Sequence, residues 1–359
     1  MRYYKIEKEA IATTDRIWMG IDAHKKTLHV TVLDDDGQVV ISESVPHGRA
    51  HVAGLVGRFS DAEITAVYEA GPTGYKLLEW LEELGCDAYM CPPTHVRQKS
   101  GGKRIKTDQR DSFDLAEQAR AGMLPSVHCL GEETYRERQV VRTRGQLVEH
   151  RSATKAQIKS LLLFHGVRAP DELKTNWSKA HMAWLEEGPT GDENIDLAIE
   201  TLVELIKSLD RQIKRLEARL RQMEKSQKWA DQAELLRSVP GIGAVSAMLL
   251  LLELGDVSRF DRCEELSSWL GLVPSEWSSG DGQSKGSITR SGNKRARTAL
   301  VESSWTLISK DAWMRMVYER IKAKSCAGVA IVAIARRLAL SIRAMLRDEK
   351  KYEYDPIAT

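Results

Sequence analysis

The sequence predicts a mixed α/β domain followed by a mostly helical region, and three patterns support this prediction. In the first 130 residues, short β-branched strands alternate with helical segments. Between residues 195 and 223, apolar side chains recur at alternating spacings of three and four, as in a long helix with a narrow apolar seam. From residue 229 onward the pattern is again helical, with one irregular interruption rich in glycine and serine at residues 275–292.

The N-terminal segments follow an order that favours one fold. We expect, in chain order, strands at 17–21, 28–33 and 39–42, a helix at 50–59, a strand at 64–68, a helix at 77–84 and a strand at 88–90. An Asp-Asp-Asp-Gly turn joins the second strand to the third. Three antiparallel strands followed by β-α-β units match the ribonuclease-H-like fold, with a generic α/β sandwich as the alternative.

The central region contains two long predicted helices. The first, at 132–164, is unusually basic beyond its acidic first residues. The second, at 195–223, has a heptad seam with isoleucines at its a positions and leucines at its d positions: Ile199, Ile206, Ile213, Leu202, Leu209 and Leu216. This seam favours a two-stranded parallel coiled coil, but an antiparallel partner within the chain is also open. We therefore divide the chain into a domain at 1–130, a coiled-coil arm at 131–228 and a mostly helical C-terminal domain at 229–359.

The composition excludes several classes of protein. The 359 residues are 42% apolar and 29% charged, which excludes a disordered chain, and the net charge of +2 does not by itself indicate a nucleic-acid partner. The five cysteines are scattered without a Cys-x-x-Cys pair, and the apolar runs are shorter than the roughly 20 residues that cross a bilayer. Because no signal peptide is recognisable, we expect a soluble cytoplasmic protein without a membrane partner.

Four acidic residues stand where a metal site could form. Asp22 and Glu69 end the first and fourth predicted strands, and Asp108 and Asp111 lie one turn apart on one face of a helix start. Several such carboxylates would balance two magnesium ions, which activate the attacking oxygen and stabilise the leaving oxygen of a phosphodiester. Each residue alone is better explained as a helix cap or a turn residue. Together they favour a divalent-metal site.

Basic residues and glycine turns suggest contacts with a polyanion, although each is also explained by a solvated surface or by packing. Six cations crowd the segment around the helix start: Arg97, Lys99, Lys103, Arg104, Lys106 and Arg110. The basic helix adds Arg138, Arg142 and Lys155. The turn with Gly241 and Gly243 resembles a helix-hairpin-helix element, whose backbone amides bind DNA phosphates. The same turn also simply packs two helices.

The glycine- and serine-rich interruption is the last candidate. Ser278 and Ser279 precede Gly280 there, and Arg290, Lys294 and Arg297 follow downstream. The spacing alone favours a phosphate-binding loop over a serine nucleophile. If a serine did attack a phosphate, the downstream cations would stabilise the negative charge that develops in the reaction.

These blocks together resemble one family over nearly the whole chain: the DEDD-type transposases of the "insertion sequence one-ten" family, which are recombinases guided by a bridge RNA. The matching blocks are GIDAHKKT, YEAGPTGY, KTDQRD, SVPGIG, LGLVPSEWSSG and ITRSGNKRAR. The resemblance implies a RuvC-like N-terminal domain whose tetrad falls on Asp22, Glu69, Asp108 and Asp111. It also implies a nucleophilic serine directly before a glycine. This serine is Ser279, and Ser278 is its immediate neighbour.

The resemblance further implies a mechanism, a cofactor and partners. Magnesium held by the tetrad positions the scissile phosphate, Ser279 attacks it, and strands are exchanged through a phosphoserine–DNA intermediate. A structured non-coding guide RNA pairs with donor and target DNA, and the protein acts as a homo-oligomer, a dimer or a tetramer, at the DNA of a prokaryotic cell. Two alternatives are a RuvC-like nuclease that uses water and needs no Ser279, and a non-enzymatic coiled-coil scaffold that binds DNA.

Overall fold

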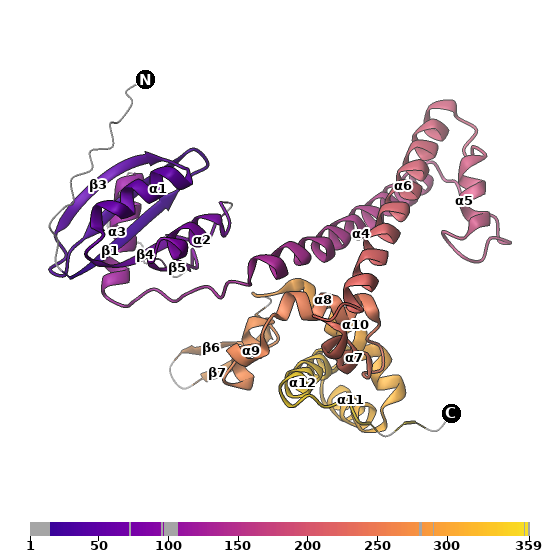
Figure 1. Cartoon of the computed structure of the whole chain (residues 1–359). Helices are drawn as coiled ribbons and strands as arrows, with labels where there is room; N and C mark the ends of the chain where they lie inside the picture. The colour runs from indigo at the N-terminus through magenta and orange to yellow at the C-terminus, as the bar shows by residue number, and fades with distance from the viewer. Residues whose placement is uncertain are drawn as a thin grey trace. The chain divides into compact units, whose positions relative to one another are not determined.

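The protein consists of two compact units, Met1–Cys129 and Leu130–Thr359 (Figure 1). The computed structural model describes residues 15–71, 73–94, 96, 107–279, 282–289, 291–354 and 356–357. The predicted boundary at residue 228 falls within the second unit, so the division into an arm and a C-terminal domain stays a prediction. No helix in the described ranges has both the length and the apolar character needed to cross a membrane.

A five-stranded mixed sheet forms the centre of the first unit. Its strands are β1 (Arg16–Ala23), β2 (Thr27–Leu33), β3 (Val39–Pro46), β4 (Glu63–Glu69) and β5 (Asp87–Cys91). They are arranged in the order β3-β2-β1-β4-β5. The pairs β1–β2 and β2–β3 are antiparallel, whereas the pairs β1–β4 and β4–β5 are parallel. The predicted mixed sheet is therefore confirmed.

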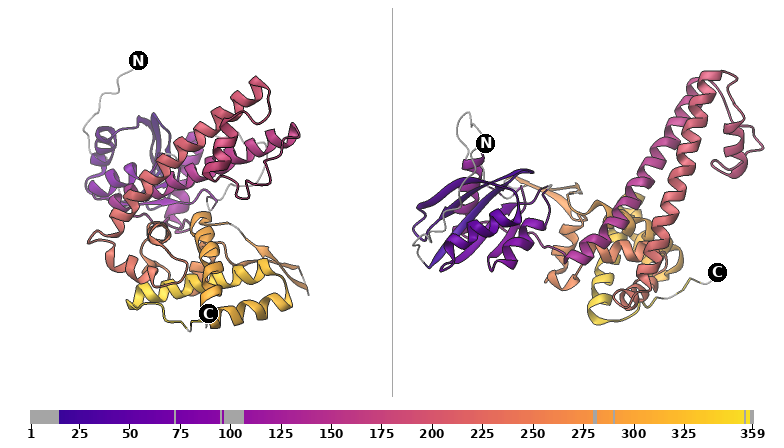
Figure 2. Two further views of the ribbon diagram at one scale, coloured as in Figure 1. Left: turned by 90° about the vertical axis from the view of Figure 1, so that its right-hand side faces the viewer. Right: turned by 45° about the horizontal axis from the view of Figure 1, so that its top comes forward.

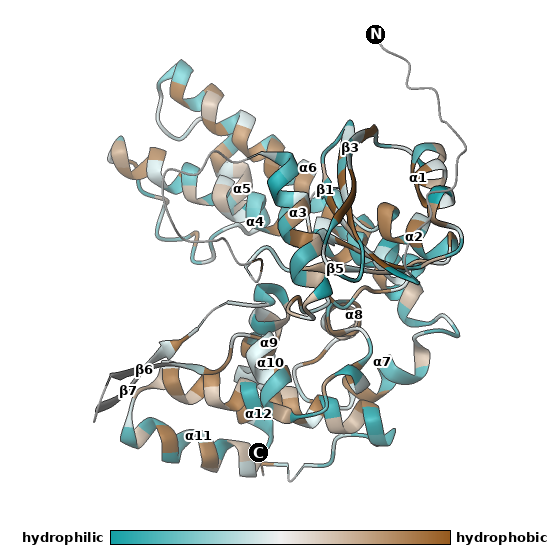
Figure 3. Cartoon of the chain, turned by 90° about the vertical axis from the view of Figure 1, so that its left-hand side faces the viewer, coloured by the Kyte–Doolittle hydropathy of each residue, from teal (hydrophilic) through white to brown (hydrophobic). Residues whose placement is uncertain are grey.

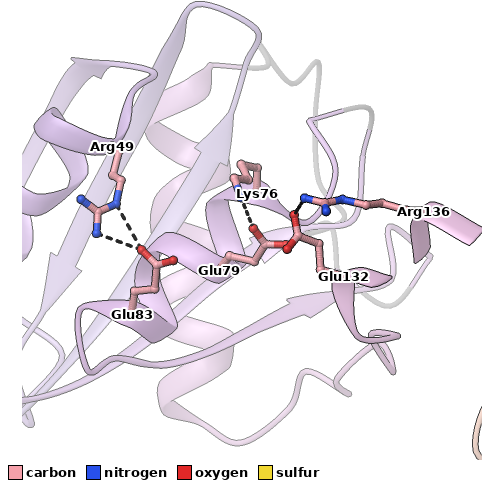
Figure 4. Close-up of polar contacts among 6 residues, drawn as sticks. All are labelled: Arg49, Lys76, Glu79, Glu83, Glu132 and Arg136. Atoms are coloured by element: carbon pink, nitrogen blue, oxygen red, sulfur yellow. Dashed lines mark hydrogen bonds and ion pairs between the residues drawn. The ribbon is translucent and has the colours of Figure 1, made fainter. Parts of the chain in front are cut away.

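Helices cover both faces of this sheet. The helices α1 (Arg49–Val56) and α2 (Lys76–Glu83) pack on one face, with the short 3-10 helix η1 (Gly57–Phe59) following α1, and α3 (Asp108–Arg120) packs on the other (Figure 3). Side chains alternate between the two faces along β1, and Ile17, Met19 and Ile21 belong to the core under α1 and α2. The exposed ion pairs Arg49–Glu83 and Lys76–Glu79 lie on α1 and α2 (Figure 4) and contribute little to stability.

Two long antiparallel helices dominate the first part of the second unit (Figure 2). They are α4 (Glu132–Phe164) and α6 (Glu193–Glu224). The short helix α5 (Lys179–Glu186) lies between them in the sequence and packs on α6. The a-position residues Ile199, Ile206 and Ile213 are buried. Ion pairs spaced seven residues apart on both helices, Arg144–Glu217 and Arg151–Asp210, show the antiparallel register. The seam therefore has a partner within the chain, the second of the two arrangements left open by the sequence.

The remaining helices of the second unit form one core. They are α7 (Ala230–Arg237), α8 (Ala244–Leu254), η2 (Val257–Arg259), α9 (Cys263–Trp269), α10 (Lys294–Lys310), α11 (Ala312–Lys324) and α12 (Ala327–Asp348). Of these, α7, η2, α9, α10 and α11 pack on the last helix, α12. In α12 the buried residues Ile331, Ile334, Leu338 and Ile342 recur every three or four positions, as expected for a helix facing a core. The sequence analysis did not anticipate α5 or α11.

The glycine- and serine-rich segment differs from its prediction. Instead of an irregular loop it forms an antiparallel hairpin of β6 (Pro274–Ser279) and β7 (Gly282–Ile288). The composition of residues 277–280 suggests a turn. In the structure, however, Trp277 pairs with Ser284, and the pairing of the two strands continues to Ser279 and Gly282. Serine and glycine propensities are weak, and pairing with a neighbouring strand overrides them.

Candidate active site

Two of the predicted carboxylates lie at the carboxyl ends of adjacent parallel strands. The register pairs Gly20 with Val67 and Ile21 with Tyr68, so Asp22 and Glu69 are the next positions on β1 and β4. Because side chains alternate along a strand, Glu69 points to the same face as Val67, which packs against α3. Asp22 likewise shares the face of Gly20, over which α3 crosses. Both carboxylates are therefore directed to the α3 side of one sheet edge.

The α3 helix approaches this edge unusually closely. A Cβ atom on Gly20 would lie 2.1 Å from the Ser112 carbonyl oxygen and 2.5 Å from the Ala116 nitrogen, so only glycine permits the crossing. The buried Ser112 hydroxyl is 2.7 Å from the Thr31 hydroxyl and 3.1 Å from Nδ1 of His29, both on β2. These contacts hold the first turns of α3 against the sheet and thereby place Asp108, the first residue of the helix.

The β1–β2 turn contributes a residue that the sequence analysis missed. Nε2 of His24 lies 3.3 Å from Oδ2 of Asp22 and 3.4 Å from Oδ1 of Asp108. One ligand atom from each of these three residues lies within 4.8 Å of the other two. Within the part of the chain that the structure describes, two of the four predicted carboxylates thus converge, together with an imidazole.

The other two predicted carboxylates lie nearby. Glu69 is exposed and lines the same cleft, of about 720 Å³, as Asp22 and His24. Asp111 follows Asp108 by one turn on α3 and is partly buried. The loop after Glu69 is held by the buried Tyr68, whose hydroxyl donates to the Gly74 carbonyl at 3.0 Å. Burial raises the pKa of Tyr68, which keeps the phenol protonated as a donor.

This donor set fits a divalent cation. Carboxylate oxygens are the preferred ligands of magnesium, and imidazole nitrogen is accepted by manganese and other transition metals. Adjacent ligands of an octahedral ion with bonds of about 2.1 Å lie roughly 3.0 Å apart, close to the observed separations around His24 Nε2. Asp22, His24 and Asp108 could therefore bind one ion after small side-chain movements.

The cationic residues predicted around the start of α3 are described only in part. Arg97, Lys99, Lys103, Arg104 and Lys106 lie outside the described residues, whereas Arg110 is an exposed residue of α3.

Several basic residues of α4 are buried or have partners within the protein. Arg138 is buried, with 8% of its surface exposed, and Arg142 donates two hydrogen bonds of 2.9 Å to the buried Glu253. Lys155 lies over the ring of Trp177 at 5.0 Å, and burial lowers its pKa. Two further basic residues of α4, Arg144 and Arg151, form the ion pairs with acidic residues of α6 that show the antiparallel register. A nucleic-acid contact through Arg138, Arg142 and Lys155 stays a prediction.

The two glycines of the Pro-Gly-Ile-Gly turn have different surroundings. Gly241 has a φ of +94°, and a Cβ atom there would lie 2.7 Å from the Ser303 carbonyl oxygen on α10. This close contact supports the packing interpretation of the turn. Gly243 instead precedes α8 as its N-cap, and no atom would lie within 4 Å of an added Cβ. Of the two glycines, Gly243 is therefore the one with open space beside its Cα atom, which a bound phosphate would need.

The structure places the predicted nucleophile at the tip of the β6–β7 hairpin. Ser279 is the last residue of β6 and pairs with Gly282, while Ser278 pairs with Gln283. Arg290 lies outside the described residues. Lys294 is exposed and lies 3.5 Å from Glu149. Arg297 donates to the Leu270 carbonyl at 2.7 Å, which anchors the turn that leads into the hairpin.

The fold and the site define an α/β enzyme with an acidic cleft at the carboxyl edge of its sheet, and comparison with known proteins makes it a transposase. A transposase model of the IS110 DEDD type matches residues 19–166, and a model described as "Transposase IS116/IS110/IS902 family" matches residues 233–319. The protein y4qE of Sinorhizobium fredii is 31% identical over 313 residues, which cover 83% of this chain and 73% of that protein. The chain belongs to the IS116/IS110/IS902 transposase family, whose members cut and recombine DNA.

Other similarities extend over almost the full length. The transposase for insertion sequence element IS1111A of Coxiella burnetii is 24% identical, covering 98% of this chain and 96% of that protein. Among solved structures, Thermus thermophilus RuvC in complex with a Holliday junction matches 31% of this chain and 99% of that chain, at 17% identity and a TM-score of 0.25. Of the two family models, the one that matches residues 19–166 covers all four predicted carboxylates, and the one that matches residues 233–319 covers Ser279.

Proposed function

We propose that this transposase breaks DNA phosphodiester bonds at a magnesium site formed by Asp22, Glu69, Asp108 and Asp111, with Ser279 as the nucleophile. The observation that carries the proposal is the convergence of Asp22 and Asp108, from β1 and α3, at a cleft that Asp22 and Glu69 both line. We interpret the sheet, with its order β3-β2-β1-β4-β5, as a RuvC-like variant of the ribonuclease-H-like fold. The family membership excludes the alternative of a non-enzymatic scaffold.

Each group has a separate role in this mechanism. A bound magnesium ion would supply positive charge that polarises the scissile phosphate and stabilises the leaving oxygen. Asp22, Glu69 and the two aspartates of α3 would hold it at the sheet edge. Ser279 Oγ forms a bond to phosphorus as the DNA oxygen leaves with a proton, which conserves the phosphoester bond in a phosphoserine–DNA link. The hydroxyl of another strand then attacks this link, joining the new strands and restoring the serine.

We further propose the partners that the resemblance implies. A structured non-coding RNA pairs with donor and target DNA, and the enzyme acts as a dimer or tetramer in the prokaryotic cytoplasm, without a membrane partner. The apolar seam of α6 packs against α4 of the same chain. Any self-association of the full-length protein therefore uses surfaces other than this seam.

The experiment that tests the chemistry traps the covalent intermediate. Labelled DNA is incubated with the full-length protein, magnesium and RNA from the same element, and denaturing gels with peptide mass spectrometry locate the adduct. The proposal expects DNA on Ser279 in the wild type, no adduct in Ser279→Ala, and DNA binding retained in that variant. An adduct that persists in Ser279→Ala but disappears in Ser278→Ala would shift the nucleophile by one residue. Cleavage without any adduct, unaffected by either change, would favour the hydrolytic nuclease.

A further inference from the structure

We infer that His24 is a nitrogen ligand of the metal site and that it shifts the preference of the site toward manganese and similar transition-metal ions. This inference rests on the proposed function, because it assumes that Asp22 and Asp108 bind a divalent cation. It adds a ligand outside the predicted tetrad. It also gives the site a property that carboxylates alone do not provide, because imidazole is a softer donor than oxygen.

The geometry places the imidazole nitrogen between the carboxylates. Nε2 of His24 is 3.3 Å from Asp22 Oδ2 and 3.4 Å from Asp108 Oδ1, so one nitrogen is close to oxygens from two different elements. The ring of this β1–β2 turn residue therefore lies beside a carboxylate of α3 as well as beside one of β1. The two separations fit a third ligand beside two oxygen ligands, and they equally fit two ion pairs, so the experiment has to distinguish these cases.

The backbone of His24 is fixed on both sides. Its amide donates to the Thr27 carbonyl at 2.9 Å, which closes the β1–β2 turn. Its carbonyl accepts a hydrogen bond of 2.7 Å from Nδ1 of His47, whose ring packs edge-on against Trp80. The ligand-bearing turn is thus held in place before any ion binds, as metal sites require of their ligands. The side chain itself is half exposed, which leaves the nitrogen accessible to an incoming ion.

The main alternative is that His24 only balances the charge of the two aspartates and leaves them when a metal binds. The two cases differ in whether nitrogen is bonded to the ion. Manganese is a suitable probe, because it binds carboxylates as magnesium does and because its electron spin senses a directly bonded nitrogen-14 nucleus.

The test uses the full-length protein with manganese alone. Pulsed electron paramagnetic resonance of bound manganese should show nitrogen-14 modulation in the wild type, and His24→Gln should abolish it. The matched control is His51→Gln, on the exposed side of α1, which should keep the modulation. His24→Gln should also weaken manganese binding by at least about tenfold, the lower end of the effect of losing even an outer-shell partner, while magnesium binding changes less.

The outcomes separate this inference from the proposed function. Wild-type manganese without nitrogen modulation, or modulation that persists in His24→Gln, would overturn the role of His24. If manganese binding is then still lost in Asp108→Asn, the carboxylate site stands and only the histidine ligand is wrong. If the wild type binds no manganese, the metal part of the proposed function is overturned together with the inference. Thermal melting of His24→Gln verifies that the variant is folded.

Discussion

Replacing Gly20 by alanine should displace α3 and disable the acidic cleft. The added Cβ atom would lie 2.1 Å from the Ser112 carbonyl oxygen, whereas ordinary contacts begin near 3.4 Å, so this part of α3 must retreat by about 1.3 Å. Both nearest obstacles are backbone atoms, which cannot rotate away. Overpacking of this kind costs roughly 1–3 kcal/mol, and we expect the upper end. A misplacement of about 1 Å in a catalytic group can cost about 100-fold in rate.

The assay measures three quantities on one variant: the melting temperature, manganese affinity and metal-dependent cleavage of DNA. Gly20→Ala should lower the melting temperature of the first unit by roughly 5–12 °C and cleavage by about 100-fold. The matched control is Gly57→Ala, in the same unit, where the backbone is helical and nothing lies within 4 Å of an added Cβ. That change should be neutral or slightly stabilising. A Gly20→Ala protein with wild-type melting and metal affinity would refute the argued role of the helix crossing.

Three further changes test other parts of the structure. Asp108→Asn should abolish metal-dependent cleavage at an unchanged melting temperature, since the amide keeps the shape but not the charge of the carboxylate; full activity would remove Asp108 from the site. Asp at both Ile206 and Ile213 should cost several kcal/mol by burying two charges between α4 and α6, and an unaltered melting curve would show that the seam is not buried. Glu253→Gln should cost about 3–5 kcal/mol, because the charge of Arg142 loses its buried partner. Burial opposes the ionisation of Glu253, but hydrogen bonds from Arg142 and the α10 N-cap outweigh it and lower its pKa. Its stabilising effect is therefore complete above the unfolded pKa of about 4.3 and lost as the pH falls through the lower folded value, so wild-type melting should decline below that pH more steeply than that of Glu253→Gln.

The strands of the first unit were predictable because their signal is local. Apolar residues recur at every second position of β1, at Ile17, Met19 and Ile21, and all three are buried. The placement of Asp22 and Glu69 also followed from the sequence, since parallel strands bring their carboxyl ends to one edge. Their convergence with Asp108 depends on the close crossing at Gly20, which only the folded chain reveals.

His24 escaped prediction for a physical reason. A histidine in an exposed β-turn has no pattern that separates a ligand from a surface residue. His24 becomes a candidate ligand because it lies beside Asp108. Asp108 is 84 positions later in the chain and comes close to His24 only when α3 packs on the sheet. The one available signal was its position two residues after a strand-end aspartate.

The basic helix shows how little a local charge excess says about the kind of partner, and its predicted contact with nucleic acid stays a prediction. Arg144 and Arg151 are matched by Glu217 and Asp210, which are remote in sequence and lie on the antiparallel partner α6. Charge patterns on one helix predict a partner of opposite charge without saying whether the partner is nucleic acid or protein. Lys159, which is exposed on α4, is a better position than Arg142 for testing a nucleic-acid contact.

Glu253 connects two regions that sequence analysis treated separately. Its carboxylate accepts both hydrogen bonds from Arg142 on α4 and a third, of 2.8 Å, from the side chain of Asn293. Asn293 in turn caps α10 through its own side-chain oxygen, five residues after the end of β7. One buried charge on α8 therefore holds the base of the long helical pair and the segment that follows the predicted nucleophile. A change at Glu253 should loosen both together, whereas Arg144, farther along α4, should affect the helical pair alone.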